Sequence, residues 1–275
     1  MALGDKKIVL LSGGPDCTAL LYDLLKNSTD ELHVHYIWIK LLNGLKSIPE
    51  KESVFNILNW CRKAFPDRPF TYTESSMRSD SVGCVDHYVW ALHGAMLVRA
   101  GFGNTLYTGR IATDNTEVGS LNQARANGIF QIVAGPNAKW EFPIDHLCKR
   151  DVIKSIPKEL FKLTWSCQNP ILSNNEYKEC YTCIGCIRRI EAMWQSELFD
   201  RDEKLYRAVS ESFDMKCPTL KEMTREELGK ITVPPNKLPP LPSEDVGNAF
   251  MFSLLDERYD SVSGHHEQIH KVRVF

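Results

Sequence analysis

The 275-residue sequence has no long hydrophobic run and no marked excess of charge of either sign. No apolar stretch approaches the ~18 residues that cross a bilayer, and Ile8–Leu11 is too short for the core of a signal peptide. Its 33 Lys and Arg against 35 Asp and Glu lack the basic excess of a dedicated nucleic-acid-binding protein. We therefore expect a cytoplasmic protein without membrane association.

Cysteine is too sparse for a disulfide scaffold, because nine cysteines are spread over the whole chain. Three of them, Cys180, Cys183 and Cys186, nevertheless recur at a strict three-residue period. An odd total with local clustering favours a reducing compartment and a metal site over a network of bridges.

Strand-like and helix-like segments alternate through the first 110 residues. Strands are expected at 8–11, 32–39, 70–73 and 105–109, and helical patterns cover 20–25, 54–65 and 87–100. This alternation predicts an α/β fold with an open parallel sheet. Because ligands bind beyond the carboxyl ends of such strands, Ser12–Asp16 and Gly109–Asn115 are expected at one site.

The composition changes after Pro143. Further helices are expected over 149–160 and 187–198, and the segment 217–242 holds six of the fourteen prolines. We expect a nucleotide-binding domain at 1–160, a metal-binding helical element at 161–200 and an extended tail at 201–275. Residues 250–255 are apolar enough to dock on the body or on a second subunit, and a homodimer is expected.

The segment Ser12-Gly13-Gly14-Pro15-Asp16 lies between a strand and a helix, which is an anion-binding arrangement. Glycines allow the backbone to approach phosphate, and Asp16 can bind Mg²⁺ or cap the helix. It is not a Walker loop, because no Gly-Lys-Ser/Thr follows. The segment predicts nucleotide binding, in preference to an ordinary strand-to-helix turn.

Ser12 to Cys17 resembles the SGGxDS signature of the PP-loop ATP pyrophosphatases, whose fold is of the adenine nucleotide α-hydrolase type. The resemblance implies ATP cleavage between the α and β phosphates, with Mg²⁺ as cofactor and with Ser12, Gly13, Gly14, Asp16, Cys17, Thr18 and Gly109 at the nucleotide. Cys17 replaces the usual serine, and Thr18 beside it can supply a hydroxyl. Cys17 is interpreted as a tolerated small residue, with a nucleophilic thiol as the alternative.

Cys180-x2-Cys183-x2-Cys186, with Cys167 upstream, supplies four thiolates at short spacing. Zinc prefers four soft ligands in a tetrahedron, and Gly185 gives the turn freedom to close around it. We predict structural Zn²⁺ at this cluster; an iron–sulfur cluster needs similar ligands, and four unrelated buried cysteines are the remaining alternative.

A PP-loop domain followed by this cysteine pattern is similar to the 7-cyano-7-deazaguanine synthase (QueC) family. The run 164–167, the run 180–188 and the segment 142–145 with Lys149 carry the likeness, which covers roughly residues 7 to 198. It implies adenylation of the carboxylate of 7-carboxy-7-deazaguanine and its capture by a nitrogen nucleophile, giving amide or nitrile. Asp16 and Lys149 are the expected catalytic residues, and Lys149 would neutralise phosphate.

Two stretches depart from that family. Residues 85–90 lack its usual Arg-Asn pair, and 110–120 lack its aromatic loop with Pro and Cys. These departures favour a paralogue that conjugates a deazapurine to an amine of a protein partner, as in antiviral defence. Alternatives are a PP-loop tRNA thiolase or lysidine synthase, and a zinc-stabilised binding protein that no longer turns over ATP.

Four further side chains are interpreted conservatively. His87 and His93 are six residues apart and share no helical face, so we expect surface or satisfied core histidines. Arg188 and Arg189 follow the cysteine cluster, and an ion pair is preferred there over a phosphate contact.

Overall fold

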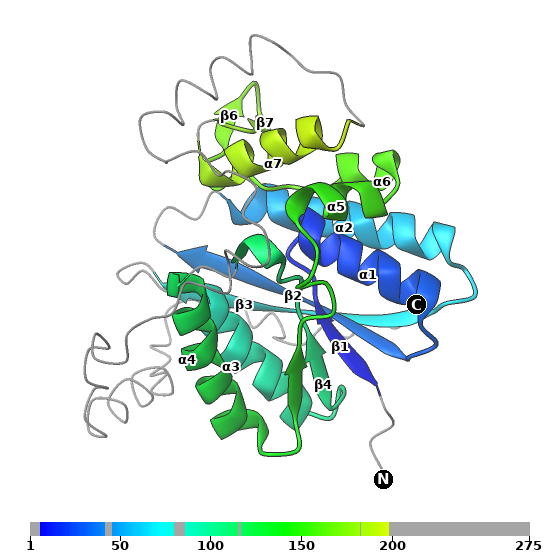
Figure 1. Ribbon diagram of the computed structural model, residues 1–275, viewed down its shortest axis with the longest axis vertical. Coiled ribbons are helices and arrows are strands. Elements are labelled where there is room, and N and C mark those ends of the chain that lie inside the picture. The colour runs from blue at the N-terminus through cyan, green and yellow to red at the C-terminus, as the bar shows by residue number, and fades with distance from the viewer. Residues whose placement is uncertain (1–5, 42–45, 80–85, 115–116, 182, 198–275) are drawn as a thin grey trace, which may run out of the picture. The chain divides into compact units, whose positions relative to one another are not determined.

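Five parallel strands form the centre of the chain in a computed structural model that describes residues 6–41, 46–79, 86–114, 117–181 and 183–197 (Figure 1). The strands of this sheet are β1 (Lys7–Leu10), β2 (Leu32–Leu41), β3 (Phe70–Ser79), β4 (Thr105–Tyr107) and β5 (Lys139–Glu141). The helices that follow them are α1 (Pro15–Asn27), α2 (Ser47–Ala64), α3 (Asp86–Arg99), α4 (Glu117–Ala134), α5 (Lys149–Ser155) and α6 (Lys158–Lys162), with a 3-10 turn, η1, at Ala112–Asp114. The predicted α/β class with an open parallel sheet is confirmed.

The strand order is β3-β2-β1-β4-β5. The chain therefore adds β2 and β3 on one side of β1 and then crosses to the other side of β1, where it adds β4 and β5. Val9 of β1 pairs with Val34 of β2 on one side and with Tyr107 of β4 on the other. The loops after β1 and β4 therefore leave the same edge at the point where the order reverses. Sheets of this kind bind their ligands at such a point.

Both faces of β1 are covered, which explains its uninterrupted apolar sequence. Val9 belongs to a core that includes side chains of α1, α2, α5 and α6, whereas Ile8 and Leu10 belong to a second core beneath α3 and α4. Figure 1 shows these two helical layers on opposite sides of the sheet. Because Ile8, Val9 and Leu10 are at most 5% exposed, β1 is fixed from both sides and the loop after it starts from a rigid base.

One expected helix was wrong. The predicted helix over 149–160 is divided into α5 and α6, since Pro157 precedes α6. Proline has no N–H to donate and disfavours helical backbone in the residue before it. Helix α4 and the short strand β5 were not anticipated.

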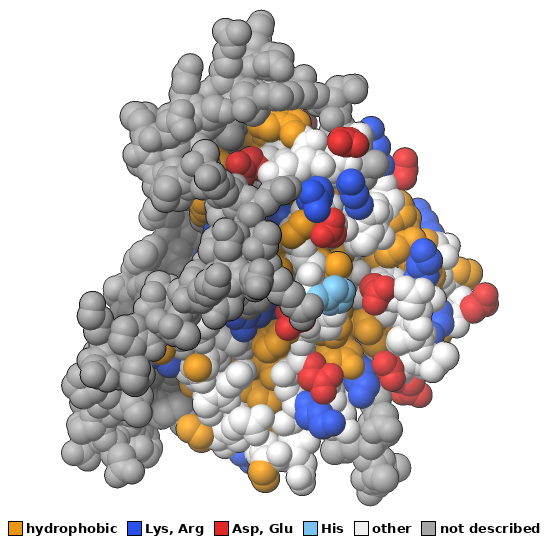
Figure 2. Space-filling model, viewed as in Figure 1, with side chains coloured by type: hydrophobic (Ala, Val, Ile, Leu, Met, Phe, Trp, Pro, Cys, Tyr) orange, Lys and Arg blue, Asp and Glu red, His pale blue; other side chains and the backbone are white. Residues whose placement is uncertain are grey.

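The cysteine-rich segment is not purely helical. It contains an antiparallel hairpin of β6 (Ile171–Ser173) and β7 (Glu176–Lys178), followed by α7 (Ile184–Gln195). The predicted tail at 201–275, the apolar segment 250–255, Cys84 and Cys217 lie outside the described residues. Within the described residues, no helix combines the length and the apolar character needed to span a membrane. Figure 2 shows Lys and Arg interspersed with Asp and Glu on the visible face, in keeping with the near-neutral sequence.

Candidate functional site

The glycine loop between β1 and α1 has the backbone of an anion site. Gly13 has a φ of 77°, and a side-chain carbon there would lie 3.0 Å from the carbonyl oxygen of Glu50. Only glycine adopts this conformation readily in so tight a space. Helix α1 starts at Pro15 with Gly14 as its N-cap and no capping side chain, so its first N–H groups face the loop. The Thr18 hydroxyl donates to the Gly14 carbonyl oxygen at 2.8 Å and holds the turn closed.

Gly109, which follows β4, closes the other side of the loop. A side-chain carbon at Gly109 would lie 2.5 Å from the backbone nitrogen of Cys17. The end of β4 thus contacts the start of α1 so closely that no larger residue fits. The structure brings together the two strand ends that the sequence assigned to one site.

Asp16 and Lys149 meet at this edge although 133 positions separate them in the sequence. The Lys149 Nζ lies 2.6 Å from Asp16 Oδ2, while Asp16 Oδ1 is buried and has no hydrogen-bond partner. Burial raises the pKa of Asp16 against the opposing effect of the Lys149 charge. A buried carboxylate oxygen without a partner carries a desolvation cost that a cation would offset. Asp16 therefore suits a divalent cation such as Mg²⁺.

A second charged pair, Asp114 and Arg188, extends the site. Arg188 Nη1 lies 3.9 Å from Asp114 Oδ1, and both charges act on the pKa of Asp16, Asp114 raising it and Arg188 lowering it. Sequence reasoning gave Asp114 no role and preferred an ion pair for Arg188. The ion pair is present, and it lies close to the phosphate loop. The position of Asp114 just after β4 was the signal that could have identified it.

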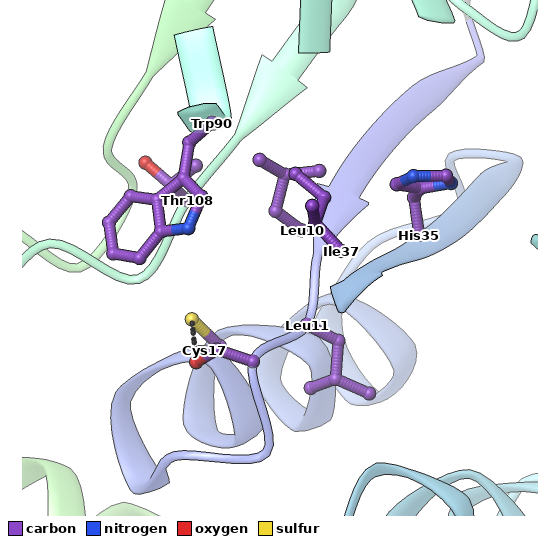
Figure 3. Close-up of a pocket in the computed structure, with 8 residues that line it drawn as sticks. Leu10, Leu11, Cys17, His35, Ile37, Trp90 and Thr108 are labelled. Atoms are coloured by element: carbon purple, nitrogen blue, oxygen red, sulfur yellow. Dashed lines mark hydrogen bonds between the residues drawn. The ribbon is translucent and has the colours of Figure 1, made fainter. Parts of the chain in front are cut away.

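An apolar pocket opens beside the glycine loop, on the face of the sheet that α3 covers (Figure 3). Its lining comes from the ends of β1 and β4, from the middle of β2, and from α1 and α3: Leu10, Leu11, Ser12, Cys17, His35, Ile37, Trp90 and Thr108. In Figure 3 the Trp90 ring and the His35 ring lie on opposite sides of Leu10 and Ile37. The free space between these side chains is about 20 Å³, which is room for about one water molecule, so the pocket is a small apolar niche beside the glycine loop. The sequence did not single out His35, and it named Trp90 only as part of a departure from the family.

Cys17 lies in this pocket as a buried thiol. Its Sγ accepts a hydrogen bond from the Ser12 hydroxyl at 3.5 Å, and burial raises its pKa. A raised pKa keeps sulfur protonated, whereas a nucleophilic cysteine needs the thiolate. The environment of Cys17 favours the small-residue interpretation over the nucleophile.

The four cysteines of the metal cluster, Cys167, Cys180, Cys183 and Cys186, lie together. Their Sγ atoms all fall within 4.8 Å of one another, and those of Cys167 and Cys183 are 4.0 Å apart. Backbone N–H groups of Gln168 and Cys180 point at Sγ atoms of Cys183 and Cys167, at 3.3 and 3.2 Å. Such bonds orient sulfur ligands around a metal.

Gly185 allows the cysteine turn to close. A side-chain carbon at Gly185 would lie 2.1 Å from the carbonyl oxygen of Ser166. Without a metal the Cys167 thiol would stay protonated, since burial raises its pKa to about 11. The cluster is built to hold a cation.

The cysteine element is joined to the glycine loop through the backbone. The Trp165 N–H donates to the Gly13 carbonyl oxygen at 2.8 Å. Arg189, only 7% exposed, donates to the Thr164 carbonyl and hydroxyl oxygens at 3.0 and 2.7 Å, and its guanidinium lies 4.3 Å from the centre of the Phe161 ring. The segment that leads into the cysteine cluster therefore holds the backbone of the glycine loop.

The two histidines of α3 have separate surroundings. His93 Nδ1 is 2.8 Å from the Ser75 hydroxyl, and the ring of His87 lies 4.9 Å from that of Trp90. The two therefore form no joint acid–base pair.

No family model matches the chain, and a search of curated proteins found no match. Among solved structures the chain is similar to U34-tRNA thiolase NcsA from Methanococcus maripaludis with its 4Fe-4S cluster. The sequence identity is 13% and the TM-score 0.42, over 76% of this chain and 70% of that one. At this level of similarity the thiolase supports neither a shared activity nor a shared cluster type.

Proposed function

We propose that this chain is an ATP-dependent enzyme of the PP-loop type that adenylates a carboxylate and transfers the acyl group to a nitrogen nucleophile. The observation that carries the proposal is the buried Asp16 Oδ1, which has no partner and lies at the start of α1 beside an uncapped helix N-terminus. A phosphate chain with its bound cation would satisfy both the carboxylate and the free N–H groups.

The residues of the site divide the chemistry among them. The N–H groups of the glycine loop and of the first turn of α1 would bind the pyrophosphate that leaves ATP. Lys149 and Arg188 would offset the negative charge that develops there, and Asp16 would hold Mg²⁺. Bound at Asp16, Mg²⁺ supplies charge neutralisation of the departing phosphates.

The pocket beside the loop would have to widen to admit a flat, ring-containing substrate or nucleoside. Its walls have suitable chemistry, because Trp90 and Ile37 present apolar surface and Thr108 a hydroxyl. We propose 7-carboxy-7-deazaguanine as the carboxylate, following the likeness of residues 7–198 to the QueC family. The stretches 85–90 and 110–120 depart from that family, and their described parts, 86–90 and 110–114, lie next to this site, so the nitrogen is proposed to be an amine of a protein partner.

We further propose that the four cysteines hold a single Zn²⁺. Zinc–sulfur bonds of ~2.3 Å in a tetrahedron place neighbouring sulfur atoms ~3.8 Å apart. The 4.0 Å between Sγ of Cys167 and Cys183 is close to this spacing, and an iron–sulfur cluster, being larger than one ion, would hold its ligands further apart. Protein purified without oxygen should be colourless and contain zinc; iron with acid-labile sulfide would contradict this assignment.

The experiment for the activity measures pyrophosphate release from Mg²⁺-ATP in the presence of 7-carboxy-7-deazaguanine. Asp16→Asn should reduce release by at least about a hundredfold, because its neutral amide binds a cation poorly. The matched control is Asp67→Asn, an exposed carboxylate on the turn after α2, which should retain the rate.

Three outcomes are informative. Release without nitrile, together with a deazaguanine adduct on a co-expressed protein, supports the conjugating enzyme. Release with nitrile supports the synthase reaction instead. No release from wild-type protein with this substrate, or full release from Asp16→Asn, overturns the proposal.

A further inference from the structure

A continuous row of hydrogen-bonded side chains lies between β2, β3 and α3, on the same face of the sheet as the pocket. We call it the histidine ladder; in order its members are Thr71, His33, Thr73, His35, Ser75 and His93. Its five hydrogen bonds are 2.7 to 2.9 Å long, and imidazole and hydroxyl alternate without a break. No step of the proposed reaction uses this row.

The register of two parallel strands creates the ladder. His33 pairs with Thr71 and His35 with Thr73, so alternate residues of both strands present their side chains on one face. Each imidazole spans two hydroxyls of β3 that are two residues apart, using both of its nitrogens. His33 and His35 are at most 3% exposed, so their nitrogens have little access to water.

The shared hydroxyls couple the tautomers of the histidines. The Thr73 hydroxyl lies 2.8 Å from His33 Nε2 and 2.7 Å from His35 Nδ1, but it has only one proton to donate. If it donates to His35, then His33 must carry its proton on Nε2 and donate to Thr73. If it donates to His33, then His35 must carry its proton on Nδ1.

The same reasoning at Ser75 extends the coupling to His93. Three rings with two tautomers each have eight combinations, and only two of them let every shared hydroxyl donate within the ladder: all Nε2–H or all Nδ1–H. The ladder changes between these states only when every proton in it moves one step.

His33 and His93 stay neutral at neutral pH, which keeps both of their tautomers accessible. Burial lowers the pKa of His33 and of His93 to about 4, and for His33 the charge of Lys6 acts in the same direction. The His33 ring also stacks on Phe102 at 4.3 Å. An extra proton would therefore not remain on His33 or His93 at neutral pH.

The ladder reaches the pocket. His35 lines it, Ser75 pairs in register with Ile37, another lining residue, and His93 follows Trp90 by one turn of α3. We propose that the histidine ladder is a proton relay, in which one proton taken up at the His93 end is matched by one proton released at the Thr71 end. No covalent bond other than N–H and O–H changes, and water accepts the released proton.

The direction in which the relay carries a proton rests on the proposed function. When an amine attacks an acyl-adenylate, the products are an amide, AMP and one proton. That proton has to leave a pocket whose walls are mainly apolar. The relay would carry it from beside Trp90 toward the amino-terminal half of β3, away from the phosphates.

The first test is independent of ATP chemistry. Long-range nitrogen–proton NMR spectra of full-length protein labelled at histidine report the tautomer of each ring. We expect His33, His35 and His93 to share one tautomer. If both tautomers are present, the ratio of Nε2–H to Nδ1–H should be the same for all three rings. A spectrum in which any two of the three differ would overturn the relay.

The second test uses the pyrophosphate assay with Mg²⁺-ATP and 7-carboxy-7-deazaguanine, now followed to the C–N product. Thr73→Val and Ser75→Ala each interrupt the ladder and should lower kcat by at least about tenfold, with KM for ATP unchanged. The double variant should be no slower than either single variant, because the loss of one hydroxyl already interrupts the relay. Ser75→Thr keeps the hydroxyl and should restore the rate, and Ser76→Ala removes an exposed hydroxyl outside the ladder and should leave it unchanged.

The outcomes separate the relay from a structural role and from the proposed function. Losses that multiply in the double variant indicate damage to packing and overturn the relay. If wild-type protein releases no pyrophosphate, the proposed function fails, and the tautomer spectra alone decide on the relay.

Discussion

Gly185→Ala should weaken metal binding, because the added methyl group has no room. Its carbon would lie 2.1 Å from the Ser166 carbonyl oxygen, whereas ordinary contacts begin near 3.4 Å, so the two backbone segments must part by about 1.3 Å. Gly185 lies between Cys183 and Cys186, and Cys167 follows Ser166. Metal–sulfur distances tolerate changes of only ~0.2 Å. The movement therefore has to displace at least one sulfur ligand.

The expected loss follows from this displacement. Overpacking a closely packed site costs roughly 1–3 kcal/mol, which corresponds to roughly a fivefold to 150-fold weaker metal affinity. Alanine is a better helix former than glycine by up to ~1 kcal/mol. Helix propensity alone therefore predicts that Gly185→Ala stabilises α7 and does not weaken metal binding. The variant thus separates a steric requirement at Gly185 from a general effect of glycine in α7.

Competition with a chromogenic chelator measures the zinc dissociation constant of each variant. Gly128→Ala is the matched control, because Gly128 lies in α4 and a side-chain carbon there meets nothing within 4 Å. It should leave zinc affinity unchanged and raise the melting temperature by roughly 2–4 °C. Wild-type affinity in Gly185→Ala would refute the steric argument.

Two further predictions concern charge. Lys149→Met leaves the largely buried Asp16 carboxylate without its cation and should cost roughly 3 kcal/mol of unfolding free energy. Adding Asp16→Asn in the same chain should restore much of this loss. Denaturant unfolding measures both variants, and equal stability of the single and double variants would contradict the prediction. Burial raises the pKa of Glu50 from 4.5 to about 7, despite the opposing charge of Lys46, so the folded state binds more protons than the unfolded state between these values. Stability should accordingly fall by up to roughly 3 kcal/mol as pH rises from 4.5 to 7, and Glu50→Gln should flatten this slope in urea unfolding; an unchanged slope would show that Glu50 does not titrate there.

The parts of the fold that could be predicted are those with a local cause. Ile8–Leu11 indicated a buried parallel strand because covered faces require an apolar run. Helix α4 was missed because Gly119 and Gly128 interrupt its pattern, and β5 because only three residues form it and two of them are exposed. Neither element carries a periodic signal that a sequence window can detect.

The candidate site divides in the same way. The cysteine spacing is local, so the cluster could be predicted from the chain alone. Asp16 and Lys149 were both expected at the site, with Lys149 near phosphate, but neither the contact of Lys149 with Asp16 nor that of Arg188 with Asp114 was expected. Each contact joins segments whose meeting depends on the whole sheet. The histidine ladder depends on the register of β2 with β3, and no residue pattern specifies that register.

The hydrogen bond from Trp165 to Gly13 also has a consequence for synthesis of the protein. Gly13 leaves the ribosome 152 residues before Trp165, which at ~5–20 residues per second is a delay of roughly 8–30 s. During that interval α1 and β1 can form, but the phosphate loop lacks the partner that holds its backbone. The cysteine cluster follows Trp165, so under the proposed function metal capture would be the last step in completing a nucleotide site that begins at the other end of the described chain. A cell short of the metal would thus accumulate chains whose sheet is formed and whose phosphate loop is not yet closed.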